Sequence, residues 1–197
     1  SIAYGKQVSY EDIYTEGITK ITDKDIKYAK SLNAAIKIFG TSKKEDGKVY
    51  AMVAPVMIQN DNPLYNVNDV FNGIFVKGNF LGDVMFYGKG AGKLPTASAV
   101  VADVVEAVRN KETVPFIWEE EKLELGSFEE CKNRFFVRVE GNKASMKDEV
   151  ANVFGKVTEV EAVSDDEYAF LTEVMTEKAF KEAAEKVTVL NRIRVEF

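Results

Sequence analysis

The alternation of apolar and polar residues in the first half of the chain predicts β-hairpins. Short apolar blocks are separated by turn residues, which is the signature of strands joined by tight connections. Two hairpins are expected: residues 34–39 with 49–53 around Asp46-Gly47, and residues 73–76 with 84–87 around Gly78-Asn79. Such strands form an antiparallel sheet with one face that needs cover, which a second subunit would supply.

A helix is predicted directly after the second hairpin. Its apolar positions recur at helical spacing: Ala97, Val100, Val101, Val104, Val105 and Val108. Because the side chain of valine is restricted in a helix, this helix must gain stability by packing its valine face against another surface. Two shorter helices are expected earlier, where Ser9 and Thr22 are each followed three residues later by aspartate, as in a capping box.

The pattern after residue 132 predicts a second architecture. Strands are expected at 135–139, 157–163, 168–172 and 189–195, with one helix capped by Ser145 and another that starts at Thr176. The order β-α-β-β-α-β is that of a ferredoxin-like domain. The predicted fold class is therefore α+β, with a mixed or antiparallel sheet in residues 1–111, a linker at 112–131 and a ferredoxin-like domain at 132–197.

Composition then limits the chemistry. The chain has 197 residues, a net charge of −6, one cysteine and no histidine. Without histidine there is no Ser-His-Asp triad or imidazole base, and we expect no metal site of the usual ligand types. The acidic balance argues against nucleic-acid binding, and no apolar run approaches the roughly 20 residues that span a bilayer. We therefore expect neither nucleic acid nor membrane as a partner.

A glycine-rich turn is the one candidate for small-molecule binding. Gly88, Gly90 and Gly92 lie between a predicted strand and the N-terminus of the valine-rich helix, an arrangement that can hold an anion or a pyrophosphate. The spacing G-x-G-x-G matches neither a Walker A loop nor the G-x-G-x-x-G fingerprint. Spacing alone leaves a tight structural turn and a ligand loop equally open.

The same turn carries a resemblance to a known family. The stretch from Tyr87 to Asp103 has the form YGxGAGxxPTASAVVxD and resembles the end of the catalytic region of homoserine dehydrogenases. The resemblance extends to residues 8–14, 16–18 and 66–72 and covers most of residues 1–110. Members of this family often carry an additional ACT domain, a β-α-β-β-α-β regulatory module, which matches the pattern predicted independently for residues 132–197.

The resemblance implies an oxidoreductase that interconverts aspartate 4-semialdehyde and homoserine with NADP or NAD, in the cytoplasmic synthesis of threonine, methionine and isoleucine. It implies that Gly92 contributes backbone to the cofactor site while Gly90 and Ala91 shape the loop. The catalytic lysine and the nucleotide-binding domain are expected upstream of Ser1, so no catalytic residue is expected in this chain, which alone would be inactive. The helix from Ala97 would pack on that domain, and the enzyme would be a dimer or tetramer.

The ACT resemblance implies an allosteric amino-acid effector such as threonine, held by the turn after the first strand. The candidate residues there are Gly141, Asn142 and Ser145, although the turn lacks the proline of the usual D-x-P-G pattern. If the altered turn holds no effector, the module would serve assembly alone. Two further readings stay open: an amino-acid-binding regulatory or assembly module without catalysis, and a protein that binds a nucleotide through the glycine loop by itself.

Overall fold

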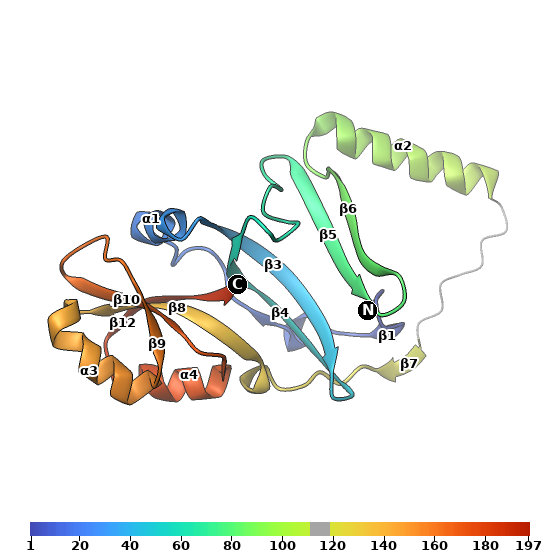
Figure 1. Ribbon diagram of the computed structural model, residues 1–197. Helices are drawn as coiled ribbons and strands as arrows, with labels where there is room; N and C mark the ends of the chain where they lie inside the picture. The colour runs from blue at the N-terminus through green and yellow to red at the C-terminus, as the bar shows by residue number, and fades with distance from the viewer. Residues whose placement is uncertain (111–118) are drawn as a thin grey trace. The chain divides into compact units, whose positions relative to one another are not determined.

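The computed structural model describes residues 1–110 and 119–197, and its largest element is an eight-stranded sheet (Figure 1). The strand order is β2-β4-β12-β8-β10-β9. β3 pairs with β4 along the edge opposite to that used by β2 and β12, and β11 pairs with β8. The strands are β2 (Tyr14–Thr15), β3 (Ala34–Glu45), β4 (Lys48–Gln59), β8 (Lys132–Glu140), β9 (Val157–Val160), β10 (Glu167–Thr172), β11 (Met175–Thr176) and β12 (Val189–Glu196). The predicted α+β class with a mixed sheet is confirmed.

The described chain divides into two units, which are treated separately below. Of the described residues, the first unit contains 1–59 and 119–197, and the second contains 60–110. Residues 132–197 therefore share a unit with the beginning of the chain. Of the predicted linker, residues 112–118 lie outside the described part, and so do Phe116, Ile117 and Trp118 within them. β7 (Glu119–Lys122) pairs with β1 (Lys6–Gln7).

The predicted β-α-β-β-α-β order is confirmed in residues 132–197. Strands β12, β8, β10 and β9 pair antiparallel in this order, which is the ferredoxin-like arrangement. Helix α3 (Lys143–Phe154) follows β8 and α4 (Glu177–Ala184) precedes β12. The predicted cap of α3 is wrong: the helix begins two residues before Ser145, because the side chain of Asn142 caps it by accepting the backbone N–H of Ser145.

Both faces of this sheet are buried, by different parts of the chain. Helices α3 and α4 cover one face, where Val150, Phe154 and Phe180 pack on inward side chains of β8 and β10. Helix α1 (Asp23–Ser31) lies on the opposite face, where Tyr28 and Ala29 join a second core cluster. The face that an isolated ferredoxin-like domain would leave open is thus covered by the first 59 residues.

The sheet also continues without a break from the ferredoxin-like strands into the first hairpin. β12 pairs parallel with β4, with Arg194 opposite Val56 and Glu196 opposite Ile58. β2 pairs with β4 one step earlier along the same edge, and the N–H of Glu16 donates to the carbonyl of Val53. β2 and β12 therefore follow one another along β4, which brings residues 14–16 beside the C-terminal strand.

The two short helices predicted from capping patterns have different outcomes. Thr22 and Asp25 form the complete capping box of α1, as expected. The pattern at Ser9 produces only a single 3-10 turn, η1 (Tyr10–Asp12), in which the Ser9 hydroxyl accepts the N–H of Glu11. The chain becomes extended at Ile13 and enters β2, so the turn cannot continue as a helix.

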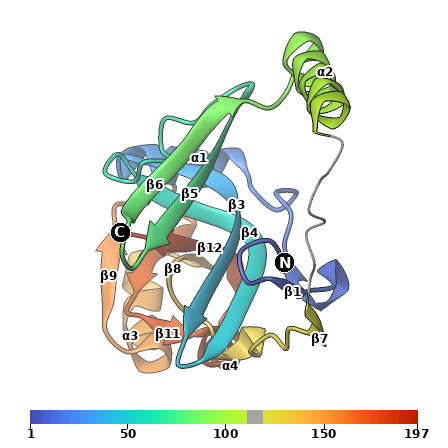
Figure 2. The same cartoon turned by 90° about the vertical axis from the view of Figure 1, so that its right-hand side faces the viewer.

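The second unit contains the other predicted hairpin and the valine-rich helix. β5 (Phe71–Gly78) and β6 (Gly82–Lys89) run side by side along their whole length (Figure 2), and α2 (Lys93–Arg109) follows them. Both predicted hairpins are confirmed in position and are longer than expected. Within the described residues, however, β5 and β6 pair only with each other, so the two hairpins do not share a sheet as predicted.

Candidate functional site: the glycine loop and the turn before α3

The glycine loop is fastened to the beginning of its own hairpin. The backbone N–H groups of Gly90 and Ala91 both donate to the carbonyl of Val70, over 3.2 and 3.4 Å. Val70 directly precedes β5, so these bonds close the open end of the hairpin. The two N–H groups are therefore engaged within the chain, and the loop has a fixed path into α2.

Two of the loop glycines are constrained, Gly92 by its backbone conformation and Gly90 by the neighbouring side chain of Asn72. A Cβ at Gly90 would collide with the side-chain amide of Asn72, which lies against the loop. Gly92 has φ 111° and ψ 151°, a backbone conformation that residues other than glycine rarely adopt. Gly88 meets neither constraint, since a Cβ there would have no neighbour within 4 Å and its φ is ordinary. The close approach at Gly90 and the turn at Gly92 set the entry into the helix.

The first turn of α2 leaves donors open. Gly92 is the N-cap and supplies no side chain, while Pro95 has no N–H. The carbonyl of Gly92 accepts both the N–H and the hydroxyl of Thr96, over 3.1 and 2.8 Å. Among the described residues, none accepts a hydrogen bond from the N–H groups of Lys93 and Leu94.

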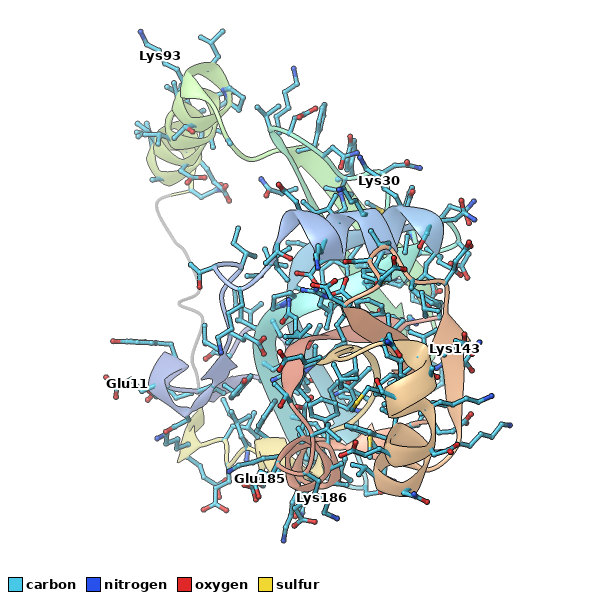
Figure 3. The ribbon with its side chains drawn as sticks, turned by 90° about the vertical axis from the view of Figure 1, so that its left-hand side faces the viewer. Glu11, Lys30, Lys93, Lys143, Glu185 and Lys186 are labelled. Carbon is cyan, nitrogen blue, oxygen red and sulfur yellow. The ribbon has the colours of Figure 1, made fainter. Side chains whose placement is uncertain are left out.

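The charge around this helix end favours an anion. No acidic residue lies in the first turn of α2, and the helix dipole places partial positive charge there. Lys93 projects from the same turn (Figure 3), and the ammonium of Lys89 lies 5.7 Å from the ring centre of Phe71. Phe71 stacks on Tyr87 with ring centres 4.8 Å apart, which stiffens the hairpin below the loop. The arrangement can hold a phosphate through backbone donors and lysine.

The described residues of the second unit leave the valine face of α2 uncovered. No residue of this 17-residue helix is buried, and the exposed fraction of Val108 is 68%. Exposed faces of this size mark contact surfaces. The observation agrees with the requirement for a packing partner that the sequence predicts, since the described residues of the second unit do not supply one.

The candidate regulatory turn lies between β8 and α3, and its polar groups bond to one another. The N–H of Ser145 donates to the side-chain oxygen of Asn142 over 3.1 Å, and the Ser145 hydroxyl donates to the Asn142 carbonyl over 2.9 Å. Gly141 has φ 101°, and its N–H donates to the carbonyl of Asp166. The three predicted residues are thus adjacent, but their hydrogen bonds serve the turn and the cap.

A groove of about 410 Å³ adjoins this turn. Gly141 and Met146 line one side of it, and Glu185 and Lys186 at the end of α4 line another (Figure 3). Glu140 and Glu149 also line it, so three carboxylates face one ammonium group. This acidity disfavours a ligand that is held by its carboxylate.

A cluster of ionic side chains near β2 was not predicted from the sequence. Glu16 accepts hydrogen bonds from Arg192 over 2.9 Å and from Arg194 over 3.0 Å, and Arg194 also pairs with the buried Glu177 over 2.6 Å. Alternate residues of a strand share a face, so Arg192 and Arg194 could have been recognised as a pair. Their partner, Glu16, is 178 positions away from Arg194 and gives no local signal.

Other reactive groups of the described residues are enclosed or dispersed. Burial raises the pKa of the Cys131 thiol, whose exposed fraction is 3%. In residues 1–110 and 119–197, no three acidic or thiol side chains are grouped so as to hold a metal ion. No helix in this part of the chain is long and apolar enough to cross a membrane.

Comparison with known proteins identifies the family of the chain. The family model described as homoserine dehydrogenase matches residues 1–105, which include the glycine loop and most of α2. A homoserine dehydrogenase of Bacillus subtilis is 32% identical over 163 residues, 81% of this chain and 36% of that protein. One from Pseudomonas aeruginosa is 42% identical over 109 residues, 55% of this chain and 25% of that protein.

Solved structures agree with the sequence relatives. A homoserine dehydrogenase from Thiobacillus denitrificans superposes with a TM-score of 0.85 at 29% identity, over 99% of this chain and 50% of that one. One from S. aureus gives 0.74 at 30% identity, over 100% and 50%. The chain spans about half the length of these structures and 25–36% of the curated relatives named above. With 105 of its 197 residues matched by the family model, the chain belongs to the homoserine dehydrogenase family.

Proposed function

We propose that this chain is the C-terminal portion of an NAD(P)-dependent homoserine dehydrogenase, which interconverts aspartate 4-semialdehyde and homoserine. The observation that carries the proposal is the entry into α2, where Gly92 leaves backbone donors open beside Lys93. Family membership supplies the reaction, and the open helix N-terminus fits a phosphate-bearing cofactor.

The residues of the loop have separate roles in this proposal. The N–H groups of Lys93 and Leu94 would hold a phosphate oxygen of the dinucleotide, and Gly92 would keep the approach free of a side chain. Gly90 and Ala91 act indirectly, because their N–H groups bind Val70 and fix the path of the loop. The bound nicotinamide would carry the hydride, and either NADP or NAD meets the chemistry of this loop.

The loop can supply only part of a cofactor site. A dinucleotide site of the usual kind adds a complete β-α-β unit with a glycine-rich turn of its own. The relatives are two to four times as long as the matched region, so we propose that the remaining donors and the catalytic lysine come from residues outside this chain. The exposed valine face of α2 would pack on that part. The isolated chain would then be inactive.

We further propose that residues 132–197 form an ACT regulatory domain and that the enzyme is a cytoplasmic homo-oligomer, a dimer or tetramer, in the synthesis of threonine, methionine and isoleucine. The ferredoxin-like strand order supports the domain type. A second candidate is a regulatory or assembly module without catalysis. The self-contained bonds of Asn142 and Ser145 favour assembly over effector binding at that turn.

A pair of glycine variants tests the role of the loop. In the full gene product that contains this chain, Gly92→Ala should weaken NADPH binding by about tenfold, because the side chain forces the loop out of its path. Gly155→Ala is the matched control, since Gly155 also has positive φ, 73°, at a helix end. Both variants should lower stability, and only Gly92→Ala should raise the dissociation constant of the cofactor. Equal cofactor binding by the two variants would contradict the role of the loop.

A further inference from the structure

The side chain of Asn72 lies against the glycine loop of the second unit. Asn72 is on β5, directly opposite Gly88 of β6. Gly88 presents no side chain, and the amide of Asn72 reaches the loop at Gly90, where a Cβ would lie 3.0 Å from Cγ of Asn72 and closer still to its Nδ2. The absence of a side chain at Gly90 therefore makes room for the side chain of Asn72.

The backbone of Asn72 is held on both sides by contacts of its neighbours. Phe71 stacks on Tyr87, with ring centres 4.8 Å apart. Gly73 is so close to the preceding segment that a Cβ there would lie 2.6 Å from Cδ2 of Leu64. Neighbouring residues of a strand point to opposite faces, so both contacts leave the face of Asn72 free. Asn72 thus extends from a rigid strand, which is what a residue that positions a functional loop requires.

The residues before β5 also hold the loop through the backbone. The carbonyl of Val70 accepts the N–H groups of Gly90 and Ala91 over 3.2 and 3.4 Å, at and beyond the upper end of the usual range for such bonds. Their length leaves part of the restraint to the contact between Asn72 and Gly90. Two residues of chain span at most roughly 7 Å, so this contact acts close to Gly92, the N-cap of α2.

The amide of Asn72 is not engaged elsewhere. Among the described residues, none forms a hydrogen bond with it, and the side chain is exposed. Its interaction with the loop is therefore one of packing, and a substitution there should act locally. The amide is also neutral, so it adds no negative charge near the helix end that would oppose a phosphate.

We propose that Asn72 is a positioning residue for the cofactor and that it acts through Gly90. Its side chain keeps the loop in the path that directs the N–H groups of Lys93 and Leu94 toward the dinucleotide. This inference rests on the proposed function, because it concerns the same loop and the same cofactor. Asn72 does not touch the reacting atoms, so its loss should lower the affinity for the cofactor and leave the chemical step intact.

Steady-state kinetics of the full gene product that contains this chain tests the role with Asn72→Ala and Asn72→Leu. Alanine removes the contact with Gly90, whereas leucine keeps a branched side chain of similar size without the amide. We expect the KM for the cofactor to rise about fivefold in Asn72→Ala, while kcat and the KM for homoserine change less than about twofold. Asn72→Leu should restore most of the affinity, because the contact acts through shape.

Hydrogen exchange in the same protein gives a readout that does not depend on turnover. In Asn72→Ala, the amide hydrogens of Gly90 and Ala91 should exchange about fivefold faster, because the loop loses one of its restraints. Asn79→Ala is the matched control. Asn79 is an exposed asparagine that follows β5 at the opposite end of the hairpin, so its substitution should change neither the cofactor KM nor the exchange of the loop.

Three results would overturn the proposal. The first is a cofactor KM or a loop exchange rate that is unchanged in Asn72→Ala. The second is an equal rise of the cofactor KM in Asn72→Leu, which would assign the effect to a hydrogen bond of the amide. The third is a fall in kcat of the same size. Failure of the proposed function is distinguishable, since the unchanged gene product would then show no homoserine-dependent reduction, and hydrogen exchange would still decide whether Asn72 holds the loop.

Discussion

The guanidinium Nε of Arg138 donates to the carboxylate of Asp25 over 2.9 Å, and this buried ion pair joins α1 to the ferredoxin-like sheet. The Nη1 group of Arg138 pairs with Glu167 on β10 over 2.6 Å. The hydroxyl of Tyr28 also donates to the carboxylate of Glu167, over 3.1 Å. All four side chains are at least 95% buried, so the polar network lies inside the core between α1, β8 and β10.

Removal of Arg138 should destabilise the fold strongly. Arg138→Met leaves the buried Asp25 without its cation and leaves Glu167 with only Lys24, 3.6 Å away, and breaking such a network costs about 3–5 kcal/mol. Urea denaturation of the purified chain should show this loss in the free energy of unfolding. Arg109→Met, at an exposed position in the last turn of α2, should cost less than about 1 kcal/mol. Similar losses for the two variants would contradict the role assigned to the network.

Acid should weaken the ionic contact between Glu16, which follows β2, and the arginines of β12. The pKa of Glu16 is lowered below its ordinary value of 4.5, because Arg192 and Arg194 outweigh the opposing effect of burial. A carboxyl group with a lowered pKa in the folded state contributes stability above pH 4.5, and this contribution is lost as the pH falls through the folded-state value. Unfolding measured from neutral pH to acid should therefore show less pH dependence in Glu16→Gln than in the unchanged chain.

Glu45→Gln is the comparison for this acid titration. The pKa of Glu45 is also lowered, by its bond to Lys43, but both side chains are about half exposed. Solvent screens such a pair, so its substitution should change the acid dependence little. If the stability of Glu16→Gln depended on acid as strongly as that of the unchanged chain, the charge of Glu16 would not stabilise the contact with β12.

The single thiol should resist modification in the folded chain. Burial raises the pKa of Cys131 above its ordinary value of 9.0, and its exposed fraction is 3%. Reaction requires the thiolate and access to it, so iodoacetamide should label Cys131 slowly under native conditions and rapidly in denaturant. Mass spectrometry at increasing urea concentration follows this labelling. Fast labelling without urea would contradict the buried position.

Elements with a local pattern could be predicted from the sequence. The helical spacing of valines located α2, and the turn residues at Asp46-Gly47 located the first hairpin, because each signal lies within the element that it forms. The cap of α3 was misplaced since Asn142 and Ser145 are both favourable N-cap residues and the pattern does not distinguish them.

Contacts between segments that are far apart in the sequence could not be predicted from it. The parallel pairing of β12 with β4 joins residues about 140 positions apart, and no local periodicity encodes it. The contacts along β4 also bring Glu16 beside Arg192 and Arg194, so this ionic cluster could not be anticipated. The glycine loop was located from sequence, whereas its bonds to Val70 and the contact of Gly90 with Asn72 required the structure.

The most direct test of the proposed function is homoserine-dependent reduction of NADP and of NAD by the full gene product that contains this chain. We predict reduction of at least one cofactor, with about a tenfold lower kcat/KM in Gly92→Ala and little change in Gly155→Ala. The 197-residue chain by itself should show no reduction. Absence of homoserine-dependent reduction of both cofactors by the full gene product would contradict the proposal.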